Sequence, residues 1–134
     1  MKSGLGARNH IISAISDDGL LFEAESGVRI AQENLERESY SVYAPEVIRL
    51  GDGSYRLYYS GWSDTIRGGI FSAISDDGLK WTKQNGPILD LDRPLDCRMI
   101  SEPCVIELND GRCRMYYEAQ DDDGNYRILS ATAV

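Results

Sequence analysis

The stretch Ile12–Leu20, ISAISDDGL, returns almost unchanged as FSAISDDGL at Phe71–Leu79. Neither copy has the pattern of a catalytic motif, and the shared SAISDDGL begins at residue 13 and again at residue 72. A phrase repeated at a fixed interval is the mark of a repeated structural unit, in which each copy has the same packing role. The first inference from this chain is therefore a repeat and not an active site.

Much of the remaining sequence repeats in nearly the same register. Pro45 falls on Pro103 and Val47 on Val105, at an interval of 58 residues. The matching pairs further along are Asp52-Gly53 with Asp110-Gly111, Tyr58-Tyr59 with Tyr116-Tyr117, and Ile70–Ala73 with Ile128–Ala131. Because chance does not give several matches in one register, these residues belong to copies of one unit.

Each unit is predicted to consist of short strands joined by turns. Residues 44–50 and 55–60 are β-rich, and the Gly-Asp-Gly between them suits a tight hairpin because Asp-Gly tolerates positive φ. Residues 69–75 and 80–83 form a second hairpin around Asp-Asp-Gly. Strands that are apolar on both faces pack between two neighbours, which is typical of a four-stranded propeller blade with strands A to D.

The predicted fold class is all-β, a partial β-propeller of about two four-stranded blades with strand order C-D, A-B-C-D, A-B-C. One propeller-repeat domain covers 1–134, with repeats at about 11–69 and 70–127 and a last strand at 126–133. SAISDDGL is then strand C and the turn after it. Aspartate and glycine set that turn, and Trp81 or Phe22 fills the gap between blades. This architectural role is favoured over a catalytic role for the Asp-Asp pair.

Two blades cannot close a ring, because propellers usually have 4–8 blades. We expect homo-oligomerisation to close it, with the N-terminal C-D hairpin of one subunit joining the C-terminal strands of the next. A homotrimer of six blades is favoured and a dimer is the alternative. A second alternative is that the chain is a fragment of a longer propeller. The extra C strand, 126–133, has no explanation in this scheme beyond displacing or extending its equivalent at 10–16.

Composition narrows the classes of partner. The protein is acidic, with a formal charge of −8 and a pI of about 4.6, so nucleic acid and anionic membrane surfaces are disfavoured and a neutral sugar is preferred. No apolar run is long enough for a membrane span, and the first residues lack the apolar core of a signal peptide. Cys97, Cys104 and Cys113 form no even framework, so free thiols and a cytoplasmic location are expected.

The segments YAPEVIRLGDGSYRLYYSGW (43–62), SAISDDGLKWTKQNGPIL (72–89) and SEPCVIELNDGRCRMYYEAQDDDGNYRILSATA (101–133) resemble the five-bladed propeller glycosidases. This superfamily includes arabinanases, β-xylosidases, invertases and levansucrases. In it a blade typically begins with an acid followed by proline and ends in an S-D-D-G-L-x-W turn. The resemblance rests on blade architecture, and it implies a propeller fold and carbohydrate as ligand.

The resemblance also implies catalytic carboxylates at the start of the innermost strands. Glycoside hydrolysis needs two carboxyl groups flanking the scissile bond. Glu102-Pro103 matches the acid-proline pair of the superfamily, but with Glu in place of the usual Asp. The matching position in the preceding blade is Ala44, and Glu46 is expected on the same strand face two residues later. Glu102 and Glu46 are thus the candidate catalytic residues of an incomplete acid set, with a binding or structural role for Glu102 favoured.

The longer connections are expected to gather at the end of the sheets where strand A begins, and a binding site is expected there. Five residues at this end are candidate ligand-binding residues: Tyr43, Trp62, Arg67, Arg93 and Arg98. Trp62 is the most informative, because aromatic faces stack on sugar rings, although packing against a neighbouring blade explains it equally well. Each of the others is alternatively solvated or paired with a nearby acid.

No cofactor and no metal is predicted. The acidic run 121–125 has carboxylates that suit Ca²⁺, but it lacks the full calcium-loop pattern, and a hairpin loop is the favoured interpretation. The presence of a single histidine, His10, disfavours a zinc site.

Three hypotheses for function follow. The favoured one is a non-enzymatic carbohydrate-binding propeller related to glycosidases. The first alternative is a glycoside hydrolase with its active site assembled across subunits. The second is a non-catalytic assembly or interaction module.

Overall fold

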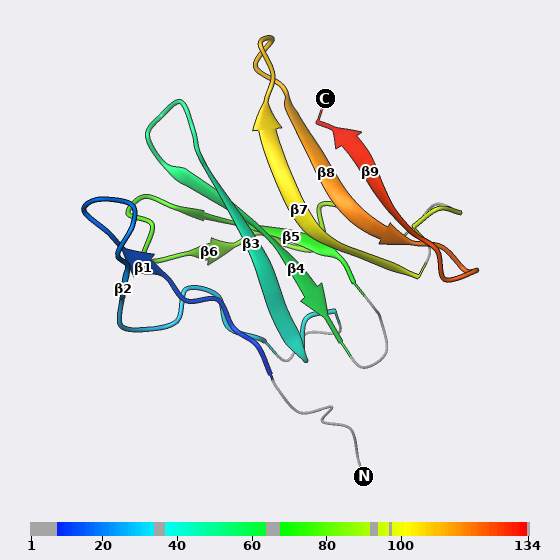
Figure 1. Ribbon diagram of the computed structural model, residues 1–134, viewed down its shortest axis with the longest axis horizontal. Helices are drawn as coiled ribbons and strands as arrows, with labels where there is room; N and C mark the ends of the chain where they lie inside the picture. Colours follow the sequence, from blue (N-terminus) through cyan, green and yellow to red (C-terminus); the bar gives the residue numbers. More distant parts are fainter. Residues whose placement is uncertain (1–7, 34–36, 64–67, 92–93, 97, 134) are drawn as a thin grey trace.

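The computed structural model describes residues 8–33, 37–63, 68–91, 94–96 and 98–133. In these ranges the chain forms nine strands in three antiparallel sheets and no helix, so none is present that is long and apolar enough to cross a membrane (Figure 1). The first sheet pairs β1 (Ala14–Ile15) with β2 (Glu23–Ala24). The second has the order β3 (Ser41–Arg49), β4 (Tyr55–Trp62), β5 (Ile70–Ser75), β6 (Thr82–Lys83). The third has the order β7 (Met99–Glu107), β8 (Cys113–Gln120), β9 (Tyr126–Thr132).

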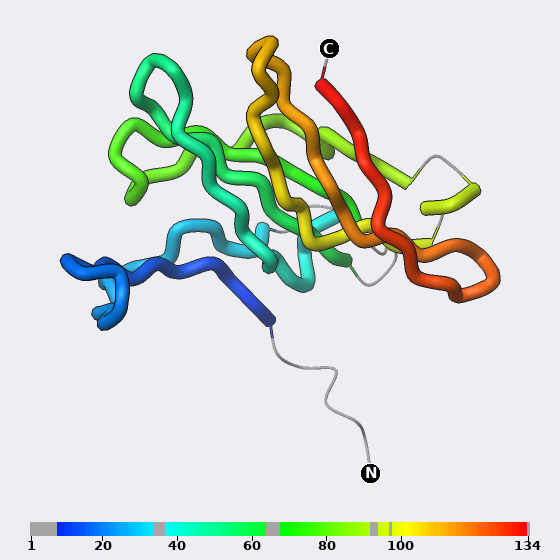
Figure 2. The backbone as a smooth tube through the Cα atoms, turned by 45° about the horizontal axis from the view of Figure 1, so that its top comes forward, coloured from blue at the N-terminus to red at the C-terminus, as the bar shows by residue number. Residues whose placement is uncertain are grey.

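This topology confirms the predicted all-β partial propeller. The sheets of two, four and three strands are the predicted C-D, A-B-C-D and A-B-C groups, in that order along the chain. The β1–β2 hairpin and the edge strand β9 lie on opposite sides of the molecule, with the β3–β6 sheet between them (Figures 1 and 2). The central sheet is therefore a blade with a neighbour on each side.

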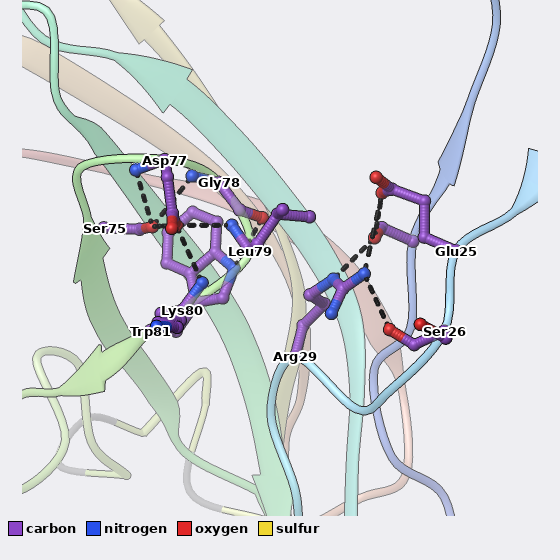
Figure 3. A network of polar contacts seen from close by, with 10 residues as sticks. Glu25, Ser26, Arg29, Ser75, Asp77, Gly78, Leu79, Lys80 and Trp81 are labelled. Carbon is purple, nitrogen blue, oxygen red and sulfur yellow. Dashed lines mark hydrogen bonds and ion pairs between the residues drawn. The ribbon is translucent and has the colours of Figure 1, made fainter.

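The repeated SDDG turn is built by the same hydrogen bonds in both copies. Asp77 Oδ1 accepts the backbone N–H groups of Leu79 and Lys80, both at 2.8 Å, and Ser75 Oγ accepts the N–H of Gly78 at 2.8 Å (Figure 3). Asp18 accepts the equivalent N–H groups at 2.8 and 3.0 Å. These donors lower the pKa of both carboxyl groups. The second aspartate of each pair is thus engaged in forming the turn.

The same comparison shows where the sequence-based expectations need correction. β3 begins at Ser41 and not at residue 44, and β6 covers only Thr82–Lys83. Trp81 packs against the core as expected and donates its Nε1–H to the carbonyl oxygen of Gly78 at 3.0 Å. Phe22 does not fill a gap between blades, because its side chain is exposed and no described sheet covers it.

Two apolar clusters hold the three sheets together. The first joins Ile11 and Ile30, at the base of the β1–β2 hairpin, to Tyr59 and Phe71 of the central sheet. The second joins Ile70 of the central sheet to buried residues of the third sheet: Ile100, Tyr117 and Ala119. Each cluster lies between consecutive blades, as the apolar faces of the strands predicted, and burial of these side chains is the main stabilising contribution.

A buried pair of a tyrosine and a carboxylate fixes the connection before each innermost strand. Tyr59 donates its hydroxyl to Glu38 Oε2 at 2.9 Å, and Tyr117 donates to Asp96 Oδ2 at 3.1 Å. Both carboxylates are fully buried. Glu38 also pairs with Lys83, and burial together with the charge of Glu38 raises the pKa of Tyr59. The second tyrosine of each Tyr-Tyr pair thus anchors the chain just before strands β3 and β7.

Gly68, two residues before β5, lies close to the backbone of β7. Its φ is +85°, and a Cβ placed there would lie 2.6 Å from the carbonyl oxygen of Ile100. Gly86 has a similar φ of +72° with no atom within 4 Å of the same position. Substitution of Gly86 therefore tests backbone strain alone, whereas substitution of Gly68 adds a steric overlap with β7.

We expect Gly68→Ala to lower the free energy of unfolding clearly more than Gly86→Ala, which should cost about 1 kcal/mol through the left-handed backbone alone. Urea denaturation followed by tryptophan fluorescence measures both values. Equal losses in the two variants would contradict the close contact between residue 68 and β7.

Candidate functional site

Two residues at equivalent positions of the repeat have the left-handed backbone conformation that only glycine adopts easily. They are Ala44, with φ of 49°, and Glu102, with φ of 54°. Each lies at a bulge, where the register shifts between Tyr43 and Glu46 in β3 and between Ser101 and Cys104 in β7. Strain of this kind costs about 1–3 kcal/mol and gathers at functional sites, so these two positions define the candidate site.

The backbone of Glu102 is held by the neighbouring blade. Its N–H donates to Ser60 Oγ at 2.8 Å, and Ser60 is fully buried on β4. The side chain of Glu102 is exposed. The carboxylate is therefore carried on a fixed backbone at the start of the innermost strand, where the sequence analysis expected it.

A second carboxylate, Glu118 on strand β8, is bonded to the residue that precedes Glu102. Ser101 Oγ donates to Glu118 Oε2 at 3.1 Å. Burial raises the pKa of the Tyr43 phenol above its usual 10.0, the side chain of Ser101 lowers it, and the negative charges of Glu102 and Glu118 raise it. Both carboxylates are thus close enough to act on one phenol.

This cluster, which we call the Tyr43–Glu118 cluster, consists of Tyr43, Ser101, Glu102 and Glu118. It joins the innermost strands β3 and β7 to β8 at the end where those innermost strands begin. An open groove of about 480 Å³ shares Tyr43 with the cluster, and its other lining residues include His10, Ile12 and Ala44. A phenol, a serine hydroxyl and two carboxylates provide donors and acceptors together, which suits a ligand rich in hydroxyl groups.

Glu46 does not share the position of Glu102. The bulge interrupts strand alternation, so Glu46, paired with Tyr58, lies on the face of Tyr43, which is paired with Ser60. Its Oε1 lies 3.5 Å from the N–H of Val105, which points to a contact between blades. The expectation that alternation returns Glu46 to the face of Ala44 is therefore wrong, because it assumed a regular strand.

The candidate ligand-binding residues lie in different settings. Tyr43 belongs to the cluster, and Trp62 is half-buried at the end of β4. Arg98 is exposed and donates its Nη1–H to the carbonyl oxygen of Asp122 at 3.3 Å, so it contacts the β8–β9 loop. Arg67 and Arg93 lie outside the described residues.

The acidic β8–β9 loop is organised by its own hydrogen bonds. Asp121 pairs with Arg127 and accepts the backbone N–H of Asn125 at 2.9 Å. These contacts lower the pKa of Asp121 to about 2, with the Arg127 hydrogen bond as the largest cause. Among the described residues, no group of three or more His, Cys, Asp or Glu side chains is placed to share a metal ion. The hairpin interpretation of this run matches its geometry.

Sequence reasoning missed Ser60, Ser101 and Glu118. Their roles depend on which blade faces which, and the strand pattern alone does not give that contact. One signal was present in the repeat: Glu118 follows the Tyr-Tyr pair where Ser60 follows it in the previous blade. A charged residue that replaces a buried serine of the repeat is a reason to examine the position.

The sequence matches no protein-family model and no curated protein. Solved structures do match. Zg3597, a family 117 glycoside hydrolase produced by the marine bacterium Zobellia galactanivorans, gives a TM-score of 0.79 at 24% identity over 92% of this chain. A second structure, described as a glycoside hydrolase, gives 0.75 at 21% identity over 90%. A thermostable family-43 glycoside hydrolase gives 0.63 at 18% identity over 84%.

The chain spans about a third of the length of these structures, with shares of 38%, 34% and 37%. At such identities the likeness establishes the fold. The chain therefore has part of the fold of the propeller-type glycoside hydrolases, as the blade motifs of the sequence indicated.

Replacing either left-handed residue by glycine should stabilise the protein. We expect Ala44→Gly and Glu102→Gly each to raise the free energy of unfolding by about 1 kcal/mol, because glycine adopts positive φ without a Cβ penalty. Glu102→Gln retains the strain and serves as the control. Chemical denaturation measures all three, and a loss of stability in both glycine variants would contradict the strained geometry.

The Asp121–Arg127 pair should make the fold sensitive to acid. Because the pKa of Asp121 is lowered from 3.8 to about 2 in the folded chain, its contribution is present above pH 3.8 and is lost as the pH falls towards 2. Asp121→Asn should therefore lower the melting temperature at neutral pH and have a smaller effect near pH 2. Thermal unfolding across this pH range tests it, and an equal effect at both ends would count against the pair.

Proposed function

We propose that the Tyr43–Glu118 cluster and the adjoining groove bind a neutral carbohydrate. The observation that carries the proposal is the strained Glu102, whose backbone is fixed by Ser60 and which follows the Ser101 bonded to Glu118. Left-handed backbone at residues other than glycine gathers at functional sites. Ala44 shares the conformation, and Glu102 is the copy of the repeat in which the conformation carries a carboxylate.

The chemistry of the cluster favours sugar hydroxyl groups. Carboxylate oxygens accept hydrogen bonds from them, and the tyrosine and serine hydroxyls donate as well as accept. The formal charge of −8 disfavours a phosphorylated or otherwise anionic ligand. A groove volume of about 480 Å³ lies in the range typical of small-molecule sites.

The fold supports this proposal only by analogy, since one fold carries many functions. The structures that the chain matches are described as glycoside hydrolases. A propeller of this kind brings the starts of its innermost strands together, and the cluster lies at that end. The carbohydrate class is therefore proposed from the site chemistry and the fold together.

Hydrolysis is a second candidate function, favoured by one observation. Ser101, which precedes Glu102, donates to Glu118, so two carboxylates belong to one cluster. Glycoside hydrolysis requires such a pair. In this scheme Glu102 and Glu118 would be the pair, in place of the Glu102 and Glu46 proposed from the sequence, and residues from a second subunit would complete the site.

Calorimetric titration with arabino-, xylo- and fructo-oligosaccharides tests binding. We expect at least one series to bind, and Glu118→Gln and Tyr43→Phe each to weaken it about tenfold, the effect of losing one hydrogen bond to a charged or well-placed group. Glu107→Gln is the matched control, because Glu107 is an exposed acid at the opposite end of β7. The absence of binding to all three series, or equal binding by all variants, would overturn the proposal.

Release of reducing sugar from the same oligosaccharides separates binding from hydrolysis. Under the hydrolytic alternative, Glu102→Gln abolishes release and largely preserves the binding heat. Under the favoured proposal, the unmodified protein binds and releases nothing. Release that is unchanged in Glu102→Gln would exclude this residue as a catalytic carboxylate.

A further inference from the structure

The third sheet exposes residues whose equivalents in the central sheet are buried. Ile128 is 71% exposed, whereas Ile70, at the same position of the repeat, is fully buried. Tyr116 is 38% exposed, whereas its equivalent Tyr58 is 7% exposed. The cross-strand pairs Glu118–Ile128 and Tyr116–Ser130 place these side chains on one face, which we call the open face of β7–β9.

The opposite end of the chain shows the complementary exposure. Ile12, in the approach to β1, is 57% exposed, and Phe22, between β1 and β2, is 63% exposed. Their equivalents in the central sheet, Phe71 and Trp81, pack into the first apolar cluster. The β1–β2 hairpin therefore exposes an apolar surface, and the equivalent surface of the central sheet is packed in the first apolar cluster.

The molecule itself shows how two such surfaces fit together. Ile70 of the central sheet and Leu129 of the third sheet belong to one apolar cluster between the two blades. Along the repeat, Ile128 is the equivalent of Ile70, and Ile12 is the equivalent of Leu129 and Phe71. Because Leu129 packs against the cluster that contains Ile70, we expect Ile128 to lie near Ile12 when one end meets the other.

We propose that the open face of β7–β9 binds the β1–β2 hairpin of a second copy of this chain, head to tail. Ile128 and Tyr116 of one copy pack on Ile12 of the other in the manner of consecutive blades. The hairpin and β9 lie on opposite sides of the molecule, so one copy does not bring its own two surfaces together (Figures 1 and 2). Such a heterologous contact can close a ring.

The hairpin counts as a blade position of its own in this arrangement. Each chain then supplies three positions, and two chains supply six, within the 4–8 blades usual for propellers. No strand has to be displaced, because β1 packs face to face against the sheet that contains β9 and does not take the place of β9 in that sheet. The proposal rests on blade packing, and its test does not depend on carbohydrate binding. The two surfaces adjoin the proposed carbohydrate site, because Glu118 is the cross-strand partner of Ile128 and Ile12 lines the groove.

The test is the solution mass of the 134-residue chain and three variants, by light scattering after size exclusion. The unmodified chain is expected to have a mass of at least two copies. Ile128→Asp and Ile12→Asp should each reduce it to one copy, because every contact contains both positions. Leu79→Asp is the control: Leu79 is exposed in the turn between β5 and β6 of the central sheet, which has a sheet on each side, so its position stays outside any contact of this kind.

Mixing the two monomeric variants gives the decisive result. Ile12→Asp retains an intact open face and Ile128→Asp retains an intact hairpin, so the mixture should regain a mass of two copies. Circular dichroism confirms that both variants, altered at exposed positions, remain folded. A monomeric unmodified chain, a mixture that stays monomeric, or an equal loss of mass in Leu79→Asp would overturn the proposal.

Discussion

The buried hydrogen bond between a tyrosine and a carboxylate is the constraint on which the rest of the structure depends. A carboxylate removed from water is costly unless it is paired, and Tyr59 and Tyr117 each donate to such a group, Glu38 and Asp96. Each bond fixes the connection before an innermost strand to the middle of its own blade. The bond thereby fixes the start of that strand, where the candidate site lies, without any contribution from the side chains of the site.

The position of the site depends on these anchored connections and on the bulges in β3 and β7 that come after them. In a regular strand, residue 102 would have extended backbone, and its N–H would take part in the ladder. The bulge releases that N–H, and Ser60 of the neighbouring blade accepts it. The contact between blades therefore does more than bury apolar surface, because it also holds the backbone from which Glu102 extends. A site of this kind depends on two blades at once.

The sequence was sufficient for the architecture because the information there is local. Turns such as Ser75–Leu79 are formed by neighbours in the chain, and the repeat spacing then orders the strands. The site was only partly predictable. Glu102 and Tyr43 could be found because each lies near the start of an innermost strand. The bulge that separates Glu46 from them, and the contact that brings Glu118 close, depend on register and on packing between blades.

Ala44 has the same left-handed conformation as Glu102, although it carries no acid that would need it. The fold therefore imposes the conformation, whichever side chain is present. A single nucleotide substitution converts an alanine codon into one for aspartate or glutamate. The unfavourable free energy of the left-handed backbone is present at this position with alanine as well. A mutation can therefore add or remove an acid here while the backbone stays unchanged. During evolution, such a position allows a blade to gain or lose a catalytic acid while it continues to bind ligand.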